Sequence, residues 1–69
     1  MPPVLKPQQV IKVLESNGFQ FVKQKGSHRK YKKSGRTVIV PMHYELAKGT
    51  LLSILEQAGI SLEELLRDI

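Results

Sequence analysis

The chain has 69 residues, no cysteine and a net charge of +5, with 11 lysines and arginines against six acidic residues. A chain of this length forms a single domain, residues 1–69, with a marginal hydrophobic core. The absence of cysteine excludes disulfides and thiolate metal sites, and no apolar run is long enough to span a membrane. We therefore expect a small basic protein of the cytoplasm, without membrane association.

The first predicted element is a helix over residues 7–17. Its apolar residues Val10, Val13 and Leu14 follow the i, i+3, i+4 spacing of one helical face. Gly18 suits the left-handed position just past a helix C-terminus. The helix should therefore bury one side and end directly before this glycine.

Three strands are predicted next, over residues 19–25, 28–33 and 36–41. The first has the period of two that is typical of strands, with both of its phenylalanines on one face. The third is rich in β-branched residues, which favour strands. Gly26-Ser27 and Ser34-Gly35 separate the three runs as short turns. Such short connections predict antiparallel pairing.

The last two predicted elements are helices near residues 47–58 and 61–69. Apolar residues recur in both at the spacing of one helical face, and Ser61 with Glu64 forms a capping-box pattern. The predicted order is therefore α-β-β-β-α-α, an α+β fold. Helices should cover one face of the three-stranded antiparallel sheet, because three strands alone are not stable.

Basic residues concentrate in the strand region. Between Lys23 and Arg36 there are seven lysines and arginines and no acid, whereas four of the six acids lie within residues 56–68. A basic face beside a neutral or acidic remainder is typical of proteins that bind a phosphate backbone. The alternative is an ordinary solvated surface. We favour a polyanion, and RNA in particular.

A two-residue loop at Ser34-Gly35 would fix the pairing of its flanking strands. Tyr31 would then lie opposite Val38 on the core side, which makes it a core residue rather than a platform for base stacking. Three residues would share the exposed face: His28, Lys30 and Lys32. His43 would be a diagonal neighbour of His28, at roughly 7–8 Å. A change of one residue in the loop would reverse the faces.

His28 is the candidate catalytic residue. RNA can be cut without a metal, because its 2′-OH is an internal nucleophile that a group titrating near neutrality can deprotonate. Fixed cations and backbone N–H groups can stabilise the phosphorane. The alternative is that His28 is a polar surface residue and His43 a loop residue near the next helix. Two histidines, no cysteine and scattered carboxylates predict no metal site and no cofactor.

Residues around His28 and at the start of the next helix are candidates for RNA binding. Lys48 and Gly49 lie in a first helical turn, where free N–H groups bind phosphate. The alternative for Gly49 is that it relieves packing against the sheet. The candidate RNA-binding residues are Lys25, Gly26, Ser27, Lys30, Lys32, His43, Lys48 and Gly49.

Four motifs, in their order and spacing, resemble the HicA (YcfA-like) toxin family. They are Lys25-Gly26-Ser27-His28, Val40-Pro41-Met42-His43, Lys48-Gly49-Thr50-Leu51 and Ile54-Leu55-Glu56-Gln57-Ala58-Gly59. The resemblance runs from Gly18 to Ile60. It implies a fold similar to double-stranded RNA-binding domains and an mRNA interferase of a type II toxin–antitoxin system, which cleaves mRNA without a metal.

The resemblance also implies residue roles and a protein partner. The catalytic histidine of the family maps onto His28, and its second, less constant histidine onto His43. A HicB-type antitoxin would cover the face that bears His28. A small basic toxin need not self-associate, so we expect the toxin alone to be monomeric. The alternative function is that of an RNA-binding module without cleavage.

Overall fold

The computed structural model of the chain describes residues 4–69. Residues 1–3, which the predicted single domain also includes, lie outside the described part. The elements are α1 (Pro7–Ser16), β1 (Gln20–Lys25), β2 (His28–Lys33), β3 (Arg36–Pro41), α2 (Lys48–Ala58) and α3 (Leu62–Asp68). The predicted α-β-β-β-α-α order is confirmed, and the helix and strand ends lie within one residue of those expected.

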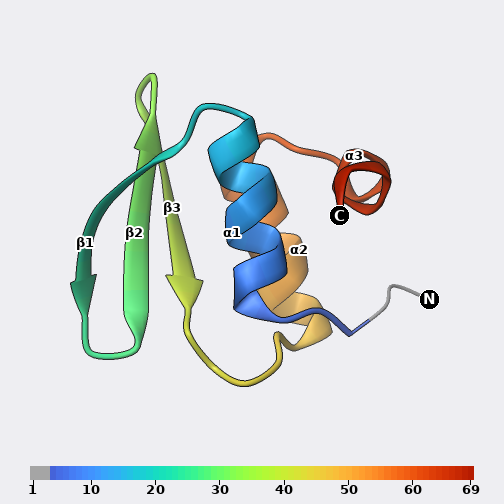
Figure 1. The fold of residues 1–69 in the computed structure, drawn as a ribbon, viewed down its shortest axis with the longest axis horizontal. Helices are drawn as coiled ribbons and strands as arrows, with labels where there is room; N and C mark the ends of the chain where they lie inside the picture. The colour runs from blue at the N-terminus through green and yellow to red at the C-terminus, as the bar shows by residue number, and fades with distance from the viewer. Residues whose placement is uncertain (1–3) are drawn as a thin grey trace.

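The three strands form one antiparallel sheet in the order β1-β2-β3. Helices α1 and α2 lie on one side of this sheet, and α3 lies farther out, in contact with α1 (Figure 1). The side chains of Tyr31, Val38 and Val40 point from the sheet toward the helices and are at most 2% exposed. They pack in one apolar cluster with residues such as Leu14 of α1 and Ile54 of α2. The core therefore sits between the sheet and the helices.

The β2–β3 turn sets the register of the sheet. Ser34 and Gly35 are its two central residues and have φ values of +45° and +82°, the pattern of a type I′ turn. Lys33 pairs with Arg36 across this turn. Tyr31 accordingly pairs with Val38, as predicted.

The β1 strand contains a β-bulge. Phe21 pairs with Tyr31 but Lys23 pairs with Lys30, so Val22 is an extra residue without a partner in β2. A bulge of this kind moves every later residue of the strand to the opposite face. Phe21 is 53% exposed because β1 is an edge strand, and its ring meets Tyr31 edge-on with centroids 5.8 Å apart.

Ser61 caps the start of α3 as expected, but in place of the reciprocal bond of a capping box its hydroxyl lies 3.4 Å from Glu64 Oε1. The Ser61 hydroxyl accepts a hydrogen bond from the Glu64 backbone N–H at 3.0 Å. Leu65 is the fully buried residue of this helix, while Leu66 and Ile69 of the predicted apolar stripe remain 39% and 50% exposed. Within residues 4–69, no helix combines the length and the hydrophobicity needed to cross a membrane.

Candidate functional site

The candidate site lies on the sheet face turned away from the core, which we call the His28 face. His28 is the first residue of β2, and it follows the Gly26-Ser27 turn directly. Lys30 and Lys32 follow at the strand period of two. Burial confirms that these residues share the face turned away from the core. Tyr31, which lies between Lys30 and Lys32 in the strand, is buried, whereas His28 is exposed.

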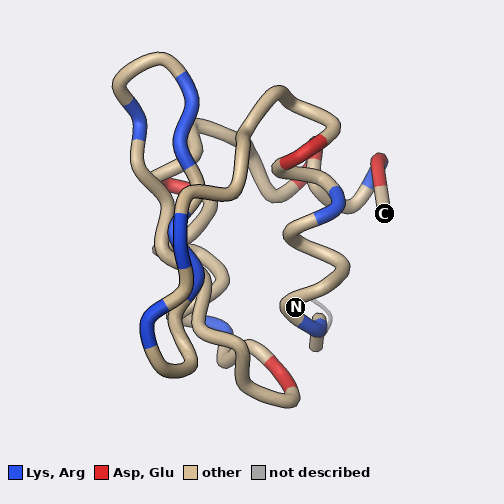
Figure 2. The backbone as a smooth tube through the Cα atoms, turned by 60° about the vertical axis from the view of Figure 1, so that its left-hand side comes forward, with Lys and Arg blue, Asp and Glu red and all other residues tan. Residues whose placement is uncertain are grey.

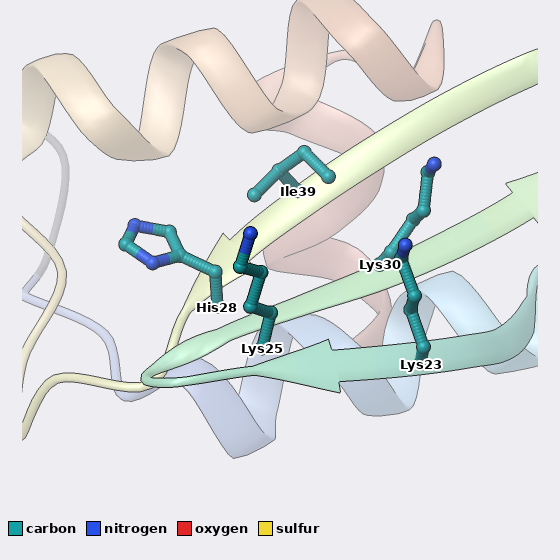
Figure 3. A pocket seen from close by; sticks show the side chains of 5 residues that line it. All are labelled: Lys23, Lys25, His28, Lys30 and Ile39. Carbon is teal, nitrogen blue, oxygen red and sulfur yellow. The ribbon is translucent and has the colours of Figure 1, made fainter.

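The bulge in β1 adds two lysines to this face. Beyond Val22, Lys23 pairs with Lys30, and Lys25 pairs with His28. Without the extra residue, both β1 lysines would point to the helix side of the sheet. Figure 3 shows all four side chains projecting from the same face. Lys25 was a predicted binding residue, but Lys23 was missed.

These residues enclose a shallow pocket of about 400 Å³, which we call the His28 pocket. Its lining consists of Lys23, Lys25, His28, Lys30 and Ile39 (Figure 3). Ile39 comes from β3 and provides an apolar wall, and no carboxylate lines the pocket. Three ammonium groups beside one imidazole favour a ligand that carries phosphate.

His43 lies next to His28, as predicted. Met42 donates its backbone N–H to the carbonyl of Ser27, which holds the chain after β3 beside the β1–β2 turn. The two imidazole ring centroids are 6.4 Å apart, with their planes at 72°. Among residues 4–69, neither imidazole is hydrogen-bonded to a carboxylate. The two rings therefore lie edge to face as neighbours, with His28 lining the His28 pocket and His43 outside it.

Lys48 and Gly49 occupy the first turn of α2, as expected, but they do not line the His28 pocket. Ala47 at the N-cap makes no side-chain hydrogen bond to the helix. A Cβ atom added to Gly49 would find no atom within 4 Å, so the alternative that Gly49 relieves packing is wrong. The start of α2 lies at the same end of the molecule as the start of β2 (Figure 1).

The remaining predicted residues are placed as follows. Lys32 is on the His28 face but outside the pocket. Gly26 and Ser27 form the exposed turn that directly precedes His28. Arg29 points to the helix side, where its Nε donates to Gln24 Oε1 at 2.9 Å. It therefore does not contribute to the site.

Charge is divided between the sheet and the rest of the molecule. Seven of the eleven lysines and arginines lie on the strands, whereas every acidic residue lies on a helix or in the loop after β3 (Figure 2). Within the described residues, no group of three histidine, aspartate or glutamate side chains gathers as a metal site would require.

Fold and site together describe a small basic α+β protein with a lysine-lined pocket beside two histidines. A family model described as the HicA toxin of bacterial toxin–antitoxin systems matches residues 7–60. This range is 54 of the 69 residues, and the chain therefore belongs to the HicA toxin family. It is the toxin of a toxin–antitoxin pair, which implies an antitoxin partner. A search of curated proteins finds no match.

Proposed function

We propose that this toxin is a metal-independent endoribonuclease that cleaves mRNA, with His28 as its general acid or base. The observation that carries the proposal is the position of His28. It lies in a pocket lined by three lysines, with a second imidazole 6.4 Å away. Imidazole changes its charge near neutral pH, and lysines supply the positive charge that attracts a phosphate backbone.

The proposed reaction uses the 2′-OH of the RNA as its nucleophile. One imidazole removes the 2′-OH proton while the oxygen attacks the adjacent phosphorus, and the bond to the 5′-oxygen breaks as that oxygen receives a proton. The products are a 2′,3′-cyclic phosphate and a 5′-OH. Lys25 and Lys30 would stabilise the negative charge that develops on the phosphorane oxygens. His43 would contact the same phosphodiester from the other side.

The other predicted binding residues would hold the RNA around this centre. Lys32 extends the positive face along β2, and Gly26 and Ser27 offer backbone groups at the exposed turn. Lys48 and Gly49 would contact phosphates that leave the pocket toward α2, through an ammonium group and free N–H groups. The antitoxin is proposed to be of the HicB type and to cover the His28 face.

Induced expression tests the catalytic proposal. Wild type is expected to arrest growth and degrade transcripts, whereas His28→Ala is not. The His28 side chain is exposed and its imidazole makes no hydrogen bond within residues 4–69, so the variant should fold. Lys12→Ala, on the exposed side of α1, is the matched control and should remain toxic. Equal toxicity of wild type and His28→Ala would reject the assignment.

The ends of the RNA fragments test the mechanism. Purified toxin incubated with RNA and a chelator should leave 2′,3′-cyclic phosphate ends, and ends with a 3′-OH would contradict attack by the 2′-OH. RNA that stays intact but binds the toxin, with His28→Ala binding equally well, would instead support an RNA-binding module without cleavage.

A further inference from the structure

A second pocket, which we call the Tyr44 pocket, adjoins the proposed catalytic centre. It has a volume of about 440 Å³ and is lined by Lys6, Gln8, Gln9, Met42, His43 and Tyr44. Its walls come from two segments distant in sequence, the start of α1 and the loop between β3 and α2. His43 lines this pocket and also faces His28. One of the two imidazoles of the proposed centre is therefore also a wall of the Tyr44 pocket.

The loop that carries Tyr44 is attached at both ends. On the N-terminal side of Tyr44, the backbone N–H of Met42 donates a hydrogen bond to the carbonyl of Ser27. After it, Leu46 donates its N–H to the carbonyl of Leu5 at 2.8 Å. The side chains of Leu5 and Leu46 are buried, at 3% and 4% exposure. An ordered loop presents an aromatic ring at a lower entropic cost than a flexible one.

Tyr44 is the most exposed of the large apolar side chains that the structure describes, at 78%. A tyrosine ring in this position contributes little to the core. The ammonium of Lys6 lies 5.1 Å from its ring centroid, within cation–π range. The pocket thus combines an exposed aromatic face, a cation and the side-chain amides of Gln8 and Gln9. Aromatic faces stack on nucleobases, and amides form hydrogen bonds with base edges.

We propose that the Tyr44 pocket is a nucleobase subsite for a nucleotide next to the cleaved phosphodiester, with its base stacked on Tyr44. This inference rests on the proposed ribonuclease function. The Tyr44 pocket would add recognition of a base to the RNA-binding site, whose other proposed contacts are to phosphate. The Gln8 side-chain amide makes no hydrogen bond within residues 4–69, so it is free to meet the base edge.

The test uses short DNA oligonucleotides with a single ribonucleotide, so that only one linkage can be cleaved. The base on either side of this linkage is removed in turn. Tyr44→Ala should lower kcat/KM on the intact substrate by about 5- to 150-fold, mainly through KM. Tyr44→Phe should retain nearly full activity, because the ring is kept. Phe21→Leu, which removes the other exposed aromatic ring, should leave cleavage unchanged.

The substrates that lack one base provide the decisive comparison. Removing the base that occupies the subsite should lower the kcat/KM of the wild type by about the same factor as Tyr44→Ala does. The kcat/KM of Tyr44→Ala itself should not fall further when this base is removed. The proposal is overturned if Tyr44→Ala cleaves like wild type, if Tyr44→Phe is as slow as Tyr44→Ala, or if the two losses multiply.

A binding measurement separates this proposal from the ribonuclease function. Oligonucleotides with a 2′-O-methyl group at the single ribonucleotide cannot be cleaved, and their affinities should show the same pattern. If the wild type cleaves none of the oligonucleotides, the ribonuclease function fails while the binding pattern still decides the subsite. If His28 is needed but Tyr44→Ala binds every oligonucleotide like wild type, the subsite alone is rejected.

Discussion

The double variant Lys23→Ala/Lys25→Ala tests whether the bulge of β1 builds an RNA-binding face. Both lysines are exposed and line the His28 pocket, on the same side as its imidazole. For a single strand, each lysine that neutralises one phosphate adds about 0.7 to the slope of log affinity against log salt. Losing both contacts should therefore lower the magnitude of that slope by about 1.4.

The assay is fluorescence anisotropy of a 2′-O-methylated RNA, which the toxin cannot cleave, across a series of salt concentrations. The matched control is Lys12→Ala/Arg67→Ala, which also lowers the net charge from +5 to +3 but removes charges from α1 and α3. Its slope should stay close to that of wild type. Equal slopes for the two double variants would show that total charge alone drives binding, and would refute the role of the bulge.

Three further predictions concern the fold. Ser34→Asn should raise the free energy of unfolding by up to about 1 kcal/mol, because asparagine tolerates the φ of +45° better than serine; unchanged or lower stability in urea would contradict this. Gln57→Ala removes the side-chain oxygen that accepts the Ile39 N–H at 2.9 Å. It should cost about 1 kcal/mol and speed hydrogen exchange of the Ile39 amide, and unchanged protection of that amide would count against the contact. Tyr31→Ala should lose about 3–5 kcal/mol, a large share of the roughly 3–10 kcal/mol expected for 69 residues, while Tyr31→Phe should stay near wild type. Urea unfolding that showed Tyr31→Ala as stable as wild type would contradict its place in the core.

The register of β2 and β3 could be predicted because two local rules were sufficient. A two-residue turn at Ser34-Gly35 fixes the pairing, and the period of two then assigns each residue to a face. The position of His43 beside His28 followed from the same geometry. The helices were predictable for a similar reason, since their spacing and capping residues are local signals.

The bulge was not predicted, because it depends on how β1 pairs with β2. Phe21 and Val22 are two consecutive apolar residues in an otherwise alternating strand, and this interruption was the available signal. Lys23 was missed for this reason. The partial exposure of Phe21 has another cause, since β1 is an edge strand and hydrophobicity alone does not reveal which strand is at the edge.

The Tyr44 pocket could not be found from sequence at all. Its two walls are separated by more than 30 residues and meet through the backbone bridge between Leu5 and Leu46. Neither leucine carries a motif, and Tyr44 itself sits in a loop without periodicity. Only the tertiary fold places the start of α1 beside the segment that follows β3.

The His28 face and the core share no side chains. None of the residues that line the His28 pocket is buried, whereas the helix side of the sheet holds the residues that stabilise the fold. We therefore expect a single base change at the His28 codon to disarm the toxin without producing an unfolded chain for proteases to remove. A disarmed copy would persist in the cell and, if it still binds antitoxin, would draw antitoxin away from any active toxin made beside it. Loss of activity in one gene copy would then increase the toxicity of the active toxin made from another copy.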